Sequence, residues 1–178
     1  MPADLEPLAV AAADGRGPLL DRPTACFGHS MGALLAFEFA RQVRRLGQPS
    51  LTHLVVSARG APQLARTEAP VHTLPDGRFI ETLRQPFNAI PDAILAEPEL
   101  LQVFVSMLRT DFRLLETYHD RDEPPLDCPI LASGGAQDEW ARPAELAAWQ
   151  WQTRGAFKLE HFAAAFFICK RRCRNCSI

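Results

Sequence analysis

TACFGHSMGALLAFEFARQVRRLG, residues 24–47, is the stretch that decides the fold. It opens with a β-prone run at residues 24–27 and turns sharply through GHSMG at residues 28–32. From Ala33 onward the apolar residues recur at three- and four-residue spacing, which is the period of a helix with one buried face. Gly47 stands where a helix C-terminus favours a residue at positive φ. The stretch therefore predicts a strand, a tight turn and a helix.

The tight turn carries the pattern G-x-S-x-G between a strand and a helix, which is the nucleophile elbow of α/β-hydrolases. We expect a side chain at Gly28 or Gly32 to collide with the neighbouring backbone, so that only hydrogen fits at both positions. The turn then lifts the Ser30 hydroxyl above the sheet, and the helix N-terminus points its N–H groups towards the reacting centre. The N–H of Met31 is the expected oxyanion donor.

The composition fits one domain and excludes several classes of protein. The chain has 178 residues, 47% of them hydrophobic, which is enough for one core. Its net charge of -2 gives no basic surface for nucleic acid. No apolar run is long enough to cross a bilayer, and the first residues lack the pattern of a signal peptide. The five cysteines form no spaced framework, so we expect a reduced, cytoplasmic protein.

Three further runs predict strands, at residues 53–57, 128–133 and 157–162. The run at 53–57 is continuously apolar, as in a parallel strand covered on both faces. Helical patterns alternate with these runs, at residues 5–20, 74–118 and from Pro143 towards Gly155. This alternation predicts an α/β protein with a parallel sheet, whose functional site lies at the carboxyl ends of the strands.

The helical segment at residues 74–118 is an insertion between strands. Pro98 suits the first turn of its longest helix, where a missing N–H has no cost. Apolar residues follow at roughly helical spacing, namely Leu101, Phe104, Leu108, Leu115 and Tyr118. This apolar face fits a lid over an apolar substrate channel, and it fits ordinary core packing as well.

A serine nucleophile needs a base and an acid that orients the base. In α/β-hydrolases these residues follow in the order Ser, acid, His. Asp138 lies in a loop after a strand, where the acid belongs, although an aspartate after Gly-Gly is also a common turn residue. We favour the catalytic interpretation of Asp138.

The base is less clear from the sequence. Of five histidines, only His161 follows Asp138, and it alternates with Phe157 and Leu159 on a predicted strand. His161 is therefore either the base or a packed strand residue. His29 precedes the nucleophile, but its side chain should point away from the Ser30 hydroxyl. The remaining histidines lie at the ends of elements and are expected in solvent: His53, His72 and His119.

Several segments in order resemble the type II (external, editing) thioesterases of polyketide and non-ribosomal peptide synthesis, from about Leu19 to about Phe157. These segments are FGHSMGALLAFEFAR, VSARGAP, HTLPDGRF, LRTDFRLLETY and PLDCPILASGGAQDEW. The resemblance implies an α/β-hydrolase with a helical lid that hydrolyses acyl groups from phosphopantetheine thiols on acyl or peptidyl carrier proteins. It implies that Ser30 is the nucleophile, the Met31 N–H an oxyanion donor and Asp138 the acid.

The resemblance also predicts what differs in this chain. The family has a strand and a Pro-His-Ala-Gly-Gly loop well before the elbow, and this chain starts one helix before it. We therefore expect a partial sheet whose elbow strand has an exposed apolar edge. The family's base lies in Phe-Pro-Gly-Gly-His-Phe-Phe, where this chain has Phe166 in place of the histidine. His161 is five residues earlier.

We divide the chain into a partial α/β-hydrolase domain at residues 1–168 and a basic, Cys-rich tail at 169–178 without fixed structure. The cysteines of the tail have the spacing that can hold three irons of a four-iron cluster. A zinc site would need a fourth ligand besides these three cysteines. We expect neither a metal nor a cofactor. A shifted reading frame would also explain the tail. Besides a thioesterase, the sequence fits an inactive fragment, a carrier-protein binding module or, less well, an acyltransferase.

Overall fold

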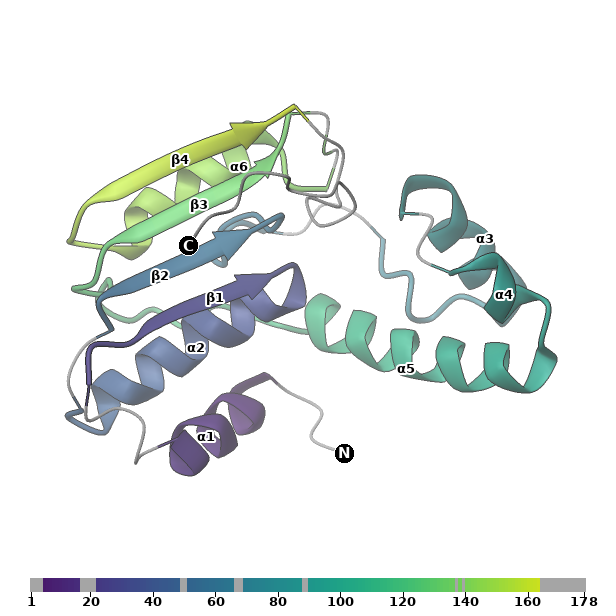
Figure 1. Cartoon of the computed structure of the whole chain (residues 1–178), viewed down its shortest axis with the longest axis horizontal. Coiled ribbons are helices and arrows are strands. Elements are labelled where there is room, and N and C mark those ends of the chain that lie inside the picture. Colours follow the sequence, from purple (N-terminus) through teal and green to yellow (C-terminus); the bar gives the residue numbers. More distant parts are fainter. Residues whose placement is uncertain are drawn as a thin grey trace.

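The computed structural model describes residues 5–16, 22–48, 51–65, 69–87, 90–136, 138 and 140–163. Within these residues, four parallel strands form one sheet in the order β1-β2-β3-β4 (Figure 1). The strands are β1 (Ala25–His29), β2 (His53–Ser57), β3 (Ile130–Gly135) and β4 (Phe157–Phe162). The predicted parallel sheet is confirmed. β2 and β4 have the predicted bounds, whereas β1 and β3 extend beyond the predicted ends to His29 and Gly135.

The carboxyl ends of the strands lie side by side at one edge of the sheet. His29 is in register with Ser57, Ser57 with Ser133, and Ser133 with Glu160. Because neighbouring strands are only about 4.8 Å apart, residues that follow β1, β2 and β3 lie within reach of one another. This edge is therefore where a site can form, as the sequence predicted.

Helices cover one face of this sheet. α2 (Met31–Arg45) follows β1, and α6 (Pro143–Ala147) continues as the 3-10 helix η2 (Ala148–Gln152) before β4. The rings of Phe37 in α2 and Trp149 in η2 meet edge to face with centroids 5.3 Å apart, so both helices lie on the same face. α1 (Leu5–Arg16) packs against α2 (Figure 1). The predicted helix from Pro143 is thus part α-helix and part 3-10 helix.

The opposite face of the sheet is less covered than the sequence predicted. One row of residues crosses this face in register: Phe27, Val55, Leu131 and Lys158. None of the four is buried, and Phe27 is 65% exposed. On β2 itself this face is partly covered within the described residues, since Val55 is half-buried and Ser57 is buried.

Three helices form the insertion between β2 and β3, which are α3 (Asp76–Phe87), α4 (Asp92–Leu95) and α5 (Pro98–Glu116). The insertion has its own apolar cluster, centred on Phe79, Leu83 and Val105. Pro98 occupies the first turn of α5, as predicted. The three helices extend beyond the carboxyl ends of the strands (Figure 1).

Candidate active site

Ser30 lies in a strained turn between β1 and α2. Its backbone has φ 52° and ψ −116°, and a residue other than glycine pays on the order of 1–3 kcal/mol for such a conformation. The Ser30 N–H donates to the carbonyl oxygen of Ser57 over 2.8 Å, and the Ser30 carbonyl accepts from the N–H of Ala33 over 3.0 Å. These bonds to β2 and to α2 hold the turn, so the predicted tight bend at Ser30 is confirmed.

The two glycines of the turn differ in what they require. A Cβ at Gly28 would lie 2.0 Å from the carbonyl oxygen of Gly32, so no larger residue fits at position 28. A Cβ at Gly32 would meet nothing within 4 Å. The predicted need for glycine is confirmed at Gly28 and wrong at Gly32, because the first turn of α2 approaches the backbone of β1 and leaves open space on its own outer side.

Asp138 follows β3 at the same edge of the sheet and is 5% exposed. Its Oδ1 accepts hydrogen bonds from the N–H groups of Trp140 over 2.9 Å and Ala141 over 3.2 Å. Its Oδ2 is buried and has no hydrogen-bond partner among the described residues. A buried carboxylate oxygen without a donor is costly, so Asp138 is oriented to receive one further N–H or O–H group.

His29 and Ser57 lie beside the elbow. The His29 Nδ1 is 3.2 Å from the Ser57 Oγ, so the imidazole faces β2. Burial lowers the pKa of His29 below its ordinary value, and the negative charge of Asp138 opposes this shift. Ser57 thus supports the turn twice, through its carbonyl and its hydroxyl. Ser57 was not among the predicted site residues, although its place at the end of the strand after the elbow is a usable signal.

Met31 is the first residue of α2. The first N–H groups of an α-helix have no intrahelical acceptor, so the Met31 N–H is available at the helix N-terminus directly after Ser30. This is the place in which an elbow presents its first oxyanion donor.

His161 lies on β4, the described strand farthest from β1 and its Ser30 turn. It is exposed near the end of β4, in register with Gly134 of β3. β1 and β4 are the two outer strands of the sheet, so three strand spacings of about 4.8 Å separate them by about 14 Å. The structure therefore gathers Ser30, Asp138 and His29 at one end of the sheet and does not bring His161 beside Ser30. Phe166, the aligned position of the family's base, lies outside the described residues.

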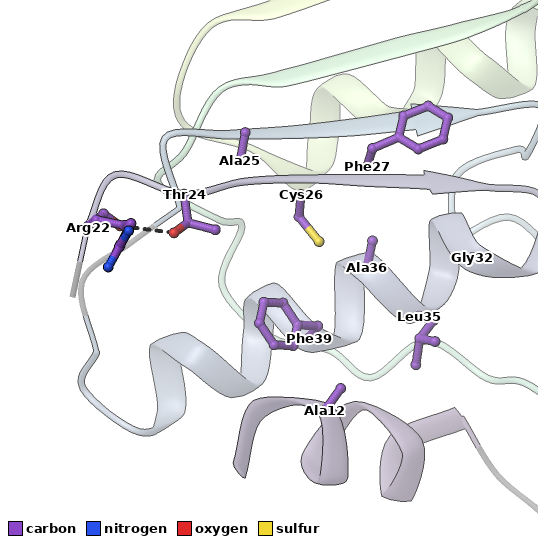
Figure 2. A pocket seen from close by; sticks show the side chains of 10 residues that line it. All are labelled: Ala12, Arg22, Thr24, Ala25, Cys26, Phe27, Gly32, Leu35, Ala36 and Phe39. Atoms are coloured by element: carbon purple, nitrogen blue, oxygen red, sulfur yellow. Dashed lines mark hydrogen bonds between the residues drawn. The ribbon is translucent and has the colours of Figure 1, made fainter. Parts of the chain in front are cut away.

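An apolar groove of about 510 Å³ follows the outer edge of β1. Ten residues of α1, α2, β1 and the segment just before β1 line it, among them Ala12, Cys26, Phe27 and Leu35 (Figure 2). β1 pairs with β2 alone within the described residues, so its other edge borders this groove. The expected exposed apolar edge of the elbow strand is present.

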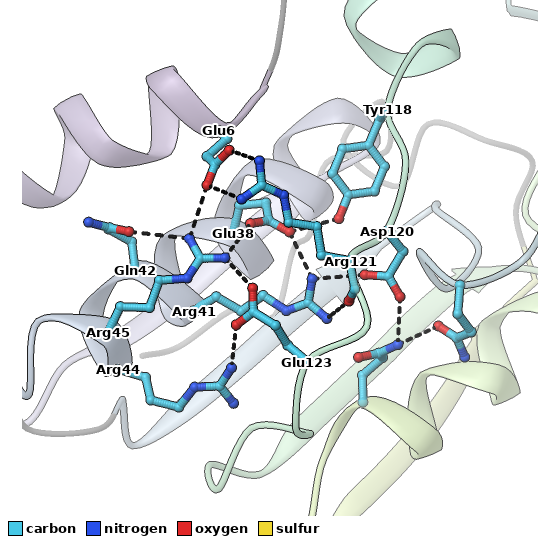
Figure 3. A network of polar contacts seen from close by, with 12 residues as sticks. Glu6, Glu38, Arg41, Gln42, Arg44, Arg45, Tyr118, Asp120, Arg121 and Glu123 are labelled. Carbon is cyan, nitrogen blue, oxygen red and sulfur yellow. Dashed lines mark hydrogen bonds and ion pairs between the residues drawn. The ribbon is translucent and has the colours of Figure 1, made fainter.

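The arginines of α2 take part in an internal polar network (Figure 3). Arg41 is 1% exposed and pairs with Glu38 and Asp120. Arg44 donates to Pro124 and pairs with Glu123, which also pairs with Arg45. Because the guanidinium of Arg41 is buried, this residue belongs to the packed interior and not to a solvated face of α2.

Neither a metal site nor a membrane span is found in the part of the chain that the structure describes. No cluster of three or more His, Cys, Asp or Glu side chains there is arranged to bind a metal ion. No described helix combines the length and the apolar character that a bilayer crossing needs. The Cys-rich tail, residues 169–178, lies outside the described residues.

A parallel sheet whose first described strand ends in a positive-φ serine, with a buried aspartate after the third, defines a protein of the α/β-hydrolase class. The chain belongs to the thioesterase family. The family model of the thioesterase domain matches residues 2–172.

Known relatives agree with this assignment. The gramicidin S biosynthesis protein GrsT of Aneurinibacillus migulanus is 36% identical over 156 residues, which are 88% of this chain and 60% of GrsT. The prodiginine-pathway thioesterase RedJ of Streptomyces coelicolor superposes with a TM-score of 0.82 at 40% identity, over 89% of this chain and 62% of RedJ. BorB, a type II thioesterase from the borrelidin biosynthetic cluster, superposes with a TM-score of 0.81 at 39% identity, over 92% of this chain and 66% of BorB. The resemblance to type II thioesterases is confirmed, and this chain spans about 60% of GrsT.

Proposed function

We propose that this chain carries the nucleophile and the acid of a type II thioesterase, which hydrolyses acyl groups from the phosphopantetheine thiol of acyl or peptidyl carrier proteins in the cytoplasm. One observation supports this above the others. The strained Ser30 turn lies at the same end of the sheet as Asp138, whose buried Oδ2 has no donor among the described residues. The similarity to BorB supports the type II class.

The proposed reaction has two acyl-transfer steps. The Ser30 Oγ attacks the thioester carbonyl carbon, an ester bond forms, the carbon–sulfur bond breaks, and the proton of the hydroxyl reaches the leaving thiol through the base. Water then attacks the acyl-serine, which releases the free acid and restores the hydroxyl. In both steps the Met31 N–H donates to the carbonyl oxygen as negative charge develops on it.

Asp138 orients the base in this scheme. Its Oδ1 is held by two backbone N–H groups, so its Oδ2 is the atom that accepts the N–H of an imidazole. His161, the candidate from the sequence, stays a prediction. For His161 to serve, its ring would have to bridge most of the distance of about 14 Å between the outer strands.

We also propose that the insertion acts as a lid for the acyl chain. α5 carries three exposed apolar side chains, Leu100, Val103 and Met107, which are 57%, 61% and 60% exposed. Exposed apolar surface on an insertion that extends beyond the carboxyl ends of the strands (Figure 1) suits an acyl substrate better than it suits solvent.

Hydrolysis of short acyl thioesters by the full chain, with Ser30→Ala and His161→Ala beside it, tests the proposed function. Thermal melts of each variant, followed by circular dichroism, first establish that the variants fold. We expect thiol release that is lost in Ser30→Ala. Loss in His161→Ala as well would identify His161 as the base.

A second candidate, a binding module without catalysis, is favoured by the separation of His161 from β1. A folded chain that binds a phosphopantetheinylated carrier protein and gives no Ser30-dependent release would support this candidate and refute the thioesterase. Titration calorimetry with the loaded carrier protein measures that binding directly.

A further inference from the structure

Trp140 contacts two separate parts of the molecule. Its backbone N–H donates to Asp138 Oδ1 over 2.9 Å. Its half-buried side chain packs against the apolar cluster of the insertion, which is centred on Phe79, Leu83 and Val105. One residue therefore links the proposed acid to the insertion.

The second donor to the same oxygen belongs to the body of the domain. Ala141 is fully buried at the start of the α6 region, and its N–H donates to Asp138 Oδ1 over 3.2 Å. The two donors to this carboxylate are thus held by different packing. Ala141 is buried just before α6, which packs against β3, whereas the Trp140 side chain packs against the insertion.

The start of the insertion is fastened to its last helix by a single carboxylate. Glu116, at the end of α5, accepts the N–H of Val71 over 2.9 Å and the N–H of His72 over 3.0 Å. It also pairs with His72 Nδ1 at 2.5 Å, with 2% of the Glu116 side chain exposed. The expectation that His72 lies in solvent is therefore wrong, because the imidazole of His72 pairs with the buried Glu116 carboxylate of the insertion.

Arg109 fastens the same segment two turns earlier on α5. Its guanidinium donates to the carbonyl oxygens of His72 and, over 2.7 Å, of Leu74, and it pairs with Asp76 at 2.6 Å. The guanidinium also lies 4.4 Å from the centroid of the Phe79 ring. These contacts join α3 to α5, so the insertion behaves as one body rather than as separate helices.

The insertion meets the domain body across a short link. Tyr118 donates its hydroxyl to Glu38 of α2 over 2.8 Å and so belongs to the body. Only Thr117 separates Tyr118 from Glu116. A displacement of the insertion about this link moves its apolar cluster as a whole, and with it the surface against which Trp140 packs.

We propose that Trp140 is a positioning residue through which the placement of the insertion sets the orientation of Asp138; this rests on the proposed role of Asp138 as the acid. With the insertion in place, both N–H groups hold Oδ1, and Oδ2 points to the base. When the insertion is displaced, the Trp140 N–H leaves Oδ1, the carboxylate rotates and Ser30 loses reactivity. The chemistry is thereby linked to the state of the insertion.

The test measures the second-order rate of Ser30 labelling by an alkyl fluorophosphonate, followed by intact-protein mass, in the full chain. Trp140→Ala keeps the N–H and removes the packing, and Trp140→Phe keeps an aromatic ring in the cluster. We expect Trp140→Ala to slow labelling by about tenfold, the order expected from losing a hydrogen bond to a charged group. Trp140→Phe should stay within about twofold of the wild type. Trp151→Ala, at a residue that is 70% exposed, is the matched control and should label normally.

The same substitutions in an Asp138→Asn background separate positioning from structure. If Trp140 acts through Asp138, Trp140→Ala adds no further loss there. An equal loss in both backgrounds, or none in either, would overturn the coupling and leave the proposed function intact. Wild-type labelling in Asp138→Asn itself would instead overturn the proposed role of the acid, and the coupling with it.

A second substitution reaches the same question without touching the loop of Asp138. Phe79→Ala loosens the apolar cluster of the insertion. It should slow labelling in the wild-type background and not in Asp138→Asn. Unchanged labelling by folded Phe79→Ala in the wild-type background would contradict the proposal, even where Trp140→Ala fails to fold.

Discussion

Replacing Arg41 by alanine should strongly destabilise the chain, because its buried guanidinium pairs with two carboxylates. The Arg41 Nη1 lies 3.1 Å from Glu38 Oε1 and 2.8 Å from Asp120 Oδ1, and its Nη2 donates to the carbonyl oxygen of Arg121 over 3.2 Å (Figure 3). The guanidinium also lies 4.2 Å from the centroid of the Phe37 ring. Arg41 therefore joins α2 to the segment that follows the insertion.

The magnitude follows from what Arg41→Ala leaves behind. The Glu38 side chain is 4% exposed, and without Arg41 it keeps the Tyr118 hydroxyl at 2.8 Å and Arg45 at 3.9 Å. Removing one partner of a buried ion pair costs about 3–5 kcal/mol, because the other charge stays buried, and Tyr118 and Arg45 compensate it only in part. A domain of this size has a free energy of unfolding of about 5–15 kcal/mol, so the loss is a large share of the total.

Urea unfolding followed by far-UV circular dichroism measures this loss through linear extrapolation. Arg78→Ala is a matched control, because Arg78 pairs with Glu81 at the same three-residue spacing over 3.2 Å, but with the two side chains 75% and 62% exposed. We expect that control to lose less than about 0.5 kcal/mol. The double variant Arg41→Met/Glu38→Leu should be more stable than Arg41→Ala, since it leaves no buried Glu38 charge. A loss in Arg41→Ala no larger than in Arg78→Ala would refute this reasoning.

Two other predictions follow from the elbow. Gly28→Ala should lower the melting temperature and abolish Ser30 labelling, because its Cβ would lie 2.0 Å from the Gly32 carbonyl oxygen. Gly32→Ala should preserve the melting temperature and the labelling, because its Cβ would meet nothing within 4 Å. Similar melting temperatures for the two variants would contradict this geometry. Burial lowers the pKa of His29 below its ordinary 6.5, so the unfolded chain binds more protons than the folded one as the pH falls through that value. The free energy of unfolding should therefore decrease as the pH falls from about 7 to 5, and His29→Gln should remove this part of the decrease. Urea midpoints with the same pH dependence in the wild type and in His29→Gln would exclude this role of His29.

The elbow at Ser30 is predictable from the sequence because its signals are local. The short run before Gly28, the serine in the turn and the helical period after it all lie within one continuous stretch, and chain neighbours determine their conformation. Asp138 was identifiable for a similar reason, since its place after a strand and two glycines is local as well. Chain order alone favours His161 as the base, and its place on the outer strand follows from the pairing of β3 with β4.

The sequence by itself determined the class of fold, the strand–turn–helix at Ser30 and the approximate bounds of the sheet, since periodicity and turn residues act over a few positions. Only the tertiary structure decided that Arg41 is buried, that His72 pairs with Glu116 and that Trp140 contacts the insertion. Each of these facts depends on the packing of segments far apart in the chain, such as the 79 positions between Arg41 and Asp120. A local sequence pattern predicts that a polar side chain is solvated. Whether it is buried depends on hydrogen-bonding and charged partners that only the folded chain brings to it.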